Sequence, residues 1–264
     1  FKADPKKSEV KNYFTSMITK LEATKKGLVD LSKGNGEEGK GDAKGAVKSA
    51  AESAAELIGK LITAAKEVAD AATGTEAVGT VVKADAAGVA DKNSVKGIAK
   101  GIKAIVEAAG AAEKLAAAAT AAKEGNKDAG KLFTGKGANN GGEAKDASKA
   151  AGAVSAVSGE QIIKAIVDAV GSADEDQEGK KAGDAENPIQ AAIGKADDDE
   201  KAFGKDGMKK DDQIAAAIAL RGMAKNGKFA VKDADEEDAK GAVKSAAESA
   251  AELIGKLITA AKAV

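Results

Sequence analysis

The chain has 264 residues, and its 41 Lys and Arg side chains nearly balance its 42 Asp and Glu side chains, leaving a net charge of −1. This balance offers no electrostatic basis for binding nucleic acid or an anionic membrane surface, and aromatic residues, at 2%, are too few for base-stacking platforms. Because Cys and His are absent, the chain lacks disulfides, thiolate chemistry and the commonest general base and metal ligand, so we predict no catalytic residues, cofactor, metal site or nucleic-acid partner.

The first predicted helix carries a seam like that of a coiled coil. Abundant Ala, Lys and Glu with only 2 Pro favour helix throughout the chain. Asp4 and Pro5 predict the start of this helix, because a capping residue followed by Pro suits a first turn. Apolar residues then recur at alternating four- and three-residue steps up to a Gly-rich break at 34–41. They are Val10, Phe14, Met17, Leu21, Leu28 and Leu31.

A 25-residue segment occurs twice without a change, at 42–66 and at 238–262. Its charged residues recur every four positions on one face, and its apolar seam lies on another. We predict that both copies are helical and that both bury this seam. The seam residues are Val47, Leu57 and Leu61 in the first copy and Val243, Leu253 and Leu257 in the second.

Shorter helices are predicted between the two repeats. A weak helix is expected over 78–89, and Ser94 is the expected N-cap of the next helix. Ser158 and Gln161 form a capping-box pattern, in which each side chain bonds the backbone of the other residue. Further helices are predicted at 111–123, 144–157 and 162–170, and after Asn187 and Pro188.

Three long polar segments, rich in Gly or in acidic residues, separate these helices at 125–142, 171–186 and 195–207. Structureless segments longer than roughly 12–15 residues are uncommon unless they are functional or disordered. We expect all three to be exposed loops at one end of the molecule, distal to its anchored termini.

The segment 208–232 predicts a helix buried on nearly every side. Asp211 or Asp212 suits its N-terminus, and Asn226 with Gly227 suits its end. Apolar residues between these ends cover almost the whole circumference, which is typical of a helix inside a core. We expect four of them to be almost fully buried, and these are Ile214, Ile218, Leu220 and Met223.

Arg221 is the only Arg in the chain and lies on this apolar helix. An internal salt bridge to a carboxylate from a neighbouring helix is the expected role, because a buried guanidinium needs compensating partners. A ligand anchor is the functional alternative.

Three motifs resemble ligand sites but lack the required context. Residues 34–39 match the pattern G-x-G-x-x-G, although a helix and not a strand precedes them. Residues 174–186 begin like a calcium loop, but Ala185 stands where a bidentate Glu is needed. The acidic run 197–200 is interpreted as a solvated loop.

Three stretches, 94–110, 148–163 and 208–232, resemble the Vls surface lipoproteins of Lyme-disease Borrelia and the related variable large proteins of relapsing-fever Borrelia. The resemblance implies an outer-membrane, surface-exposed protein held by an N-terminal lipid anchor. The acylated Cys of the family is missing here, so we expect a soluble form trimmed at its front. Together with the residue patterns, it predicts one all-α ectodomain over 1–264, an irregular multi-helix bundle around a buried central helix.

The resemblance also implies a function in antigenic variation and immune evasion. The family's gene is rewritten by gene conversion between direct repeats, so we expect 42–66 and 238–262 to flank a variable cassette at 67–237. Expected partners are host antibodies and a second copy of the chain, and the alternative function is an adhesin using the same loops. The expected buried antigenic helix comprises Asp211, Ile214, Ile218, Leu220, Arg221 and Met223.

Overall fold

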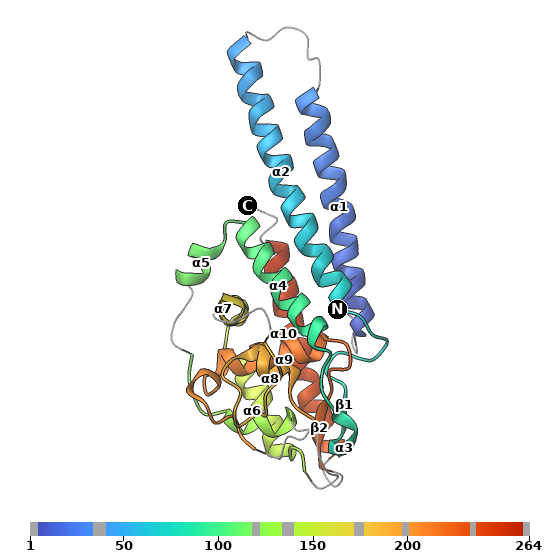
Figure 1. Cartoon of the computed structure of the whole chain (residues 1–264), viewed down its shortest axis with the longest axis vertical. Coiled ribbons are helices and arrows are strands. Elements are labelled where there is room, and N and C mark those ends of the chain that lie inside the picture. Colours follow the sequence, from blue (N-terminus) through green and yellow to red (C-terminus); the bar gives the residue numbers. More distant parts are fainter. Residues whose placement is uncertain are drawn as a thin grey trace.

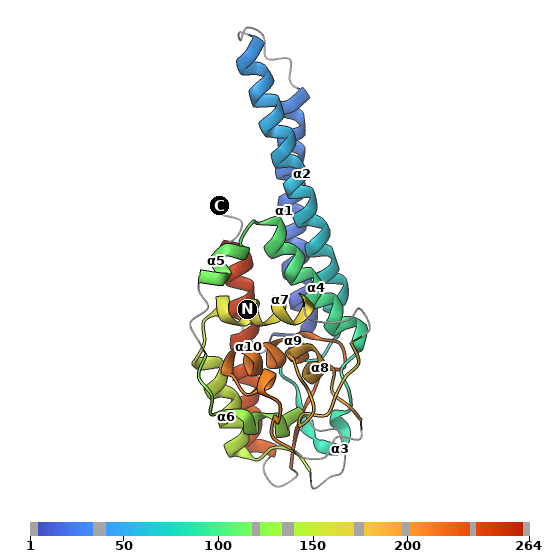
Figure 2. The same cartoon turned by 60° about the vertical axis from the view of Figure 1, so that its left-hand side comes forward.

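The computed structural model describes residues 5–33, 41–117, 122–133, 140–171, 177–196, 201–232 and 236–260. Two long helices, α1 (Lys7–Lys33) and α2 (Gly41–Ala71), form an antiparallel hairpin that projects from a body of shorter helices (Figure 1). The same projection is seen after a 60° turn (Figure 2). The prediction of a mainly helical bundle is confirmed.

The body contains the remaining elements in the described ranges. The two strands are β1 (Val81–Lys83) and β2 (Phe229–Val231). The α-helices are α3 (Ala84–Ala87), α4 (Lys92–Ala108), α5 (Ala112–Ala117), α6 (Ala144–Ser155), α7 (Gly159–Gly171), α8 (Pro188–Ile193), α9 (Asp211–Met223) and α10 (Glu236–Ala260), with short 3-10 helices η1 (Lys127–Phe133) and η2 (Asp206–Met208). Within the residues described, no single helix is long and apolar enough to span a membrane, although α6 and α7 pass that test as a pair bent by 98°.

The prediction of a weak helix over 78–89 is wrong. Val81–Lys83 forms β1, which pairs in parallel with β2 in the register Val81 to Phe229 and Lys83 to Val231. Consecutive Val residues favour an extended backbone, and the tertiary fold supplies a matching strand. Within the predicted range 78–89, the one helix that the structure describes is the short helix α3 after β1.

Two predicted helix starts are shifted. The first helix begins at Lys7 and not at Pro5, because the carbonyl of Pro5 accepts a hydrogen bond from the Val78 N–H at 2.7 Å. The cap of α4 is Asp91, whose side chain accepts the Ser94 N–H at 2.8 Å. Two other starts are confirmed: Ser158 and Gln161 bond each other's backbone, and Asn187 caps α8.

Both repeats are helical, as predicted, but their apolar faces differ in burial. Val47 and Leu57 are 54% and 46% exposed, whereas Val243 is 0% exposed. The expected burial of the first copy is therefore wrong at these two residues. The reason is position, since α10 packs on α6 and α9 inside the body, while the first half of α2 lies on the projecting hairpin. The side chains of Leu253 and Leu257 lie outside the described residues.

The seam of the first helix is likewise buried only at its start. Val10, Phe14 and Met17 are buried beside the body, and Leu31 is 58% exposed. The seam loses its cover toward the end of the hairpin that projects from the body.

The three segments expected to be exposed loops contribute to the core. Leu132 and Phe133 in η1 are buried, as are Ala182 and Phe203. The Phe133 ring lies 5.3 Å from the Phe203 ring and 5.5 Å from the Phe229 ring, centroid to centroid. The expectation of full exposure is wrong because these aromatic and small residues fill the space beside α9. The motif at 34–39, the run 197–200 and the start of the 174–186 motif lie outside the described residues.

Candidate functional site

Helix α9 lies at the centre of the body and contacts α6, α7, α8 and α10 (Figures 1 and 2). All residues from Ile214 to Met223 are buried, including Ile218 and Leu220. The expected burial is confirmed, and the apolar circumference is its cause, since each side of the helix faces a different neighbour.

The N-terminus of α9 differs from the prediction. Lys210 occupies the cap position without a side-chain cap bond, and Asp211 is the first helical residue. The Asp211 carboxylate is buried and accepts a hydrogen bond from Asn126 Nδ2 at 2.9 Å. Burial raises the pKa of both Asp211 and Asp212 above the usual value for Asp.

Helix α9 ends at Met223 with Ala224 as its C-cap, a little before the predicted pair Asn226 and Gly227, which forms the turn that follows. Asn226 has a φ of 61°, and Gly227 packs so closely that a Cβ there would lie 1.8 Å from the Arg221 carbonyl oxygen. Asn tolerates the left-handed region, and Gly alone fits the close approach. Lys225 and Asn226 are exposed at this turn.

Arg221 is fully buried and joins separate segments through backbone carbonyls. Nε donates to the Lys228 carbonyl at 2.6 Å, and Nη2 donates to the Gly88 carbonyl at 2.9 Å. Nη1 donates at 2.9 Å to Ala192 and at 3.2 Å to Ile193, whose carbonyls end helix α8. Carbonyl oxygens therefore satisfy much of the guanidinium, and the expected carboxylate partner stays a prediction.

The Arg221 guanidinium also lies over the Phe133 ring, with 5.6 Å from Cζ to the ring centroid. This geometry allows a cation–π interaction, which strengthens when both groups are removed from water. The role of η1 beside α9 was not predicted, because its residues lie in a segment interpreted as a loop.

Lys7, the first residue of α1, is a second fully buried cation. Its Nζ donates to the Gly227 carbonyl at 2.7 Å and lies 3.3 Å from Glu76 Oε2. Burial lowers the Lys7 pKa to about 8, against the opposing effect of Glu76. The sequence around Lys7 does not distinguish it from the many exposed lysines. Its side chain is buried because the tertiary fold places it against the Gly227 carbonyl, in the turn that follows α9.

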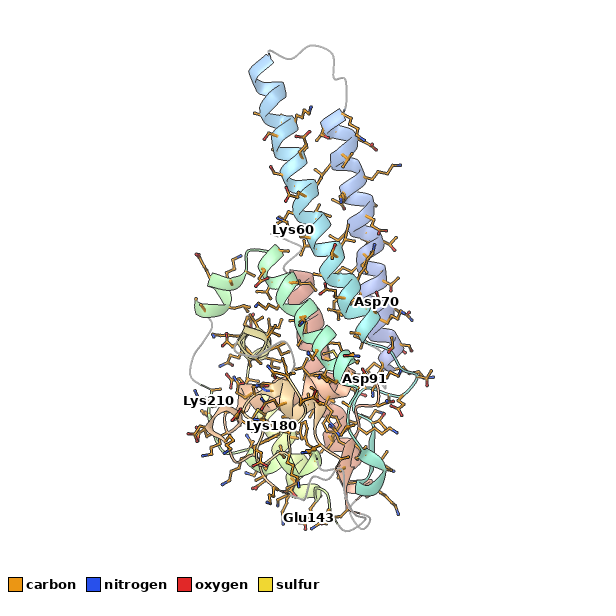
Figure 3. All side chains as sticks on the ribbon, viewed as in Figure 1. Lys60, Asp70, Asp91, Glu143, Lys180 and Lys210 are labelled. Atoms are coloured by element: carbon orange, nitrogen blue, oxygen red, sulfur yellow. The ribbon has the colours of Figure 1, made fainter. Side chains whose placement is uncertain are left out.

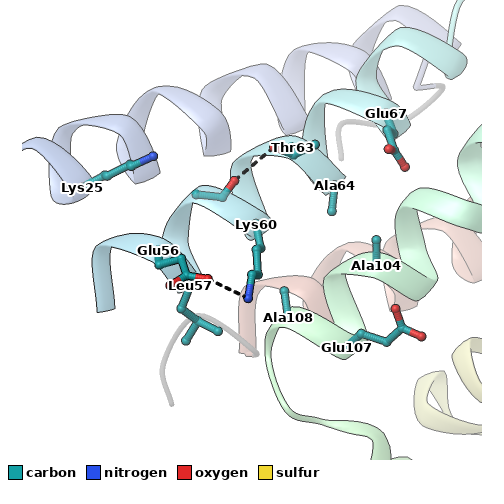
Figure 4. A pocket seen from close by; sticks show the side chains of 11 residues that line it. Lys25, Glu56, Leu57, Lys60, Thr63, Ala64, Glu67, Ala104, Glu107 and Ala108 are labelled. Atoms are coloured by element: carbon teal, nitrogen blue, oxygen red, sulfur yellow. Dashed lines mark hydrogen bonds and ion pairs between the residues drawn. The ribbon is translucent and has the colours of Figure 1, made fainter. Parts of the chain in front are cut away.

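Other features offer little for ligand chemistry. Within the described residues, no group of three or more Asp or Glu side chains could hold a metal ion. An open groove of about 750 Å³ lies between the hairpin and α4, with Ala104 and Ala108 on one side (Figure 4). On its other wall Glu56 pairs with Lys60 at 3.0 Å. Charged side chains such as Glu143 and Lys180 lie on the body away from the hairpin (Figure 3).

The fold and the site define a helical scaffold protein built around a buried helix. The model of the Borrelia lipoprotein family matches residues 1–262. The chain is 38% identical to variable large protein 17 of Borrelia hermsii over 251 residues, covering 94% of this chain and 68% of that protein. It is 36% identical to variable large protein 4 of the same organism over 262 residues, covering 98% and 70%.

The structure is also similar to the crystal structure of the Lyme disease variable surface antigen VlsE of Borrelia burgdorferi. The TM-score is 0.88 and the sequence identity 57%, covering 99% of this chain and 89% of that chain. This chain therefore belongs to the Borrelia lipoprotein family of variable surface antigens. Membership confirms the predicted family, its surface location and its non-enzymatic character.

Proposed function

We propose that this chain is the ectodomain of a lipid-anchored surface antigen that changes its exposed residues to evade host antibodies. The 57% identity to VlsE across 99% of the chain is the observation that carries this proposal. The buried helix α9 supports it, because a core sealed on every side tolerates changes at the surface without losing the fold.

The replaced cassette is proposed to be 67–237. Its first boundary falls inside α2 and its second at the start of α10, so both junctions lie within helices. Helices α4 and α6 to α9 all lie within the cassette. Replacing the cassette therefore replaces most of the residues that form the core of the body. The second repeat must still fit, which requires cassette residues such as Ala147 and Ala150 to preserve the packing between α6 and α10.

The experiment is to sequence the expressed locus from one infected animal over time. Differences should gather within 67–237 at exposed positions, and Ile214, Ile218 and Leu220 should stay unchanged. Changes that fall mainly outside 67–237, or equally on buried positions, would contradict the proposal.

Antibodies are the proposed partners of the exposed surface, and we also propose that two copies associate. The proposed contact uses the apolar residues Leu31, Val47 and Leu57, which are exposed on the hairpin and would be covered by a second copy. The adhesin alternative stays a prediction.

A further inference from the structure

The start of α1 is tied to two segments that are distant in the sequence. Lys6 and Ala77 form an antiparallel bridge, and the Lys7 N–H donates to the Glu76 carbonyl at 2.9 Å. The Lys7 side chain then passes beside Gly74, where an added Cβ would lie 3.2 Å from Lys7 Cδ. The connection between α2 and β1 therefore encloses the stem of this lysine.

The ammonium group of Lys7 ends under the turn that joins α9 to β2. Its 2.7 Å bond to the Gly227 carbonyl is formed inside the protein, with the lysine fully buried. Glu76 bridges two cations, because Oε2 lies 3.3 Å from Lys7 and Oε1 lies 3.1 Å from Lys228 on the same turn. One lysine and one glutamate thus hold the N-terminal helix to this turn.

The charged groups that face Lys7 come from three different segments of the chain. They are Glu76 before β1, Lys228 before β2 and Arg221 from α9. Glu76 attracts the Lys7 ammonium, while Arg221 and Lys228 repel it. Removing Glu76 would therefore leave three cations facing one another without this carboxylate.

Other hydrogen bonds also hold this turn: Lys225 donates its N–H to Ser94 Oγ and accepts the Asp91 N–H, both at 2.9 Å, and the Lys228 carbonyl accepts from Arg221 Nε at 2.6 Å. Gly227 donates to the Ala224 carbonyl at 3.1 Å, and Phe229 donates to the Thr80 carbonyl at 2.9 Å. Lys225 and Asn226 are already exposed. The Lys7 bond adds a tie between this turn and the N-terminal helix, and breaking a buried side-chain bond raises the free-energy cost of opening the turn.

We propose that Lys7 is a latch that keeps the turn after α9 closed, so that release of the N-terminal segment from Gly227 and Glu76 uncovers the end of α9 and strand β2. The latch lies at the first residue of α1, where the chain enters the fold. It couples the N-terminal segment to the accessibility of a segment that is otherwise buried. The latch does not depend on the proposed antigenic function. If that function holds, opening of the latch would also expose the end of α9 and β2 to antibodies.

Hydrogen exchange of the full chain tests the latch. In Lys7→Met, which keeps an apolar stem but removes the Nζ donor, the amides of Gly227 and Phe229 should exchange at least about tenfold faster, because the buried Gly227 carbonyl loses its side-chain donor in the closed state. The amide of Ile166 in the middle of α7 should keep its wild-type rate, and Lys20→Met, at an exposed position of α1, should change none of the three.

Glu76→Gln is the second variant, since it keeps the backbone pairing and removes only the charge. It should accelerate Gly227 and Phe229 by a smaller factor than Lys7→Met. Unchanged exchange at Gly227 and Phe229 in both variants would overturn the latch. An equal acceleration at Ile166 would overturn it as well, because it would show global destabilisation in place of local opening.

Discussion

At the residue scale, two buried cations hold together the region around the end of α9. Arg221 donates hydrogen bonds to the carbonyls of Lys228, Ala192 and Gly88. Lys7 donates to the carbonyl of Gly227. Burying a charge is costly unless hydrogen bonds compensate it, so the value of each residue depends on contacts that the fold assembles.

Replacing Arg221 should be strongly destabilising. Arg221→Ala removes a buried guanidinium and leaves the carbonyls of Gly88, Ala192 and Lys228 without this donor. We expect a loss of about 3–5 kcal/mol in the free energy of unfolding, measured by urea denaturation. Lys225→Ala at the exposed turn should change it by less than about 0.5 kcal/mol. Similar values for the two variants would show that the buried bonds contribute little.

Lys7 should make the stability depend on alkaline pH. Its pKa is about 8 in the folded chain and 10.5 as the ordinary value, so between these values the unfolded chain binds the extra proton and stability rises with pH. Relative to Lys7→Met, the wild-type chain should gain about 3 kcal/mol between pH 7 and pH 11. The measurement is urea denaturation of both proteins across this range. A difference that stays constant with pH would contradict the lowered pKa.

At the element scale, the two repeats show how neighbours decide the role of one sequence. The same 25 residues form helix twice, yet Val243 is buried and Val47 is exposed. The helical propensity is local and identical in both copies. The burial is not, because only the second copy lies between α6 and α9.

A matched pair of substitutions measures this difference. Val243→Ala should cost about 1.5–3 kcal/mol, since it removes apolar surface that is fully buried. Val47→Ala, in an identical sequence context, should change the free energy of unfolding by less than about 0.5 kcal/mol. The measurement is urea denaturation of both variants. Equal costs would show that Val47 is covered in solution.

At the scale of the whole molecule, the body buries every residue of α9 except Asp212 and Gln213, which are partly exposed. Antibodies raised against a peptide of residues 208–232 should therefore bind the denatured protein well and the folded protein or living cells poorly. An immunoassay on native and denatured samples measures this. If both forms bind equally, α9 is exposed and its interpretation as the buried axis is wrong.

The hairpin is the part of the molecule expected to mediate association. Sedimentation should detect dimers at tens of micromolar protein, because an interface with a micromolar Kd, about −8 kcal/mol, persists there. A variant with polar residues at Leu31 and Val47 should be monomeric. If sedimentation detects only the monomer of the wild-type chain at that concentration, the proposed association is wrong. The proposed antigenic role does not depend on this result.

Much of this protein was determined by its sequence alone. The period of the apolar residues predicted α1, α2, α9 and α10, and local capping patterns predicted the starts of α7 and α8. These features depend on residues a few positions apart, so a linear sequence contains them. Lipoprotein family membership was also predicted from the sequence and is confirmed by the comparisons.

Only the tertiary structure decided which surfaces are covered and which polar groups meet. Strand β1 exists because β2, far along the chain, lies beside it, and Phe133 and Phe203 are buried because α9 and β2 need packing partners. Lys7 reaches Gly227 across 220 positions of sequence. Such contacts depend on the relative positions of distant segments, and for that reason the same repeat is exposed on the hairpin and buried in the body.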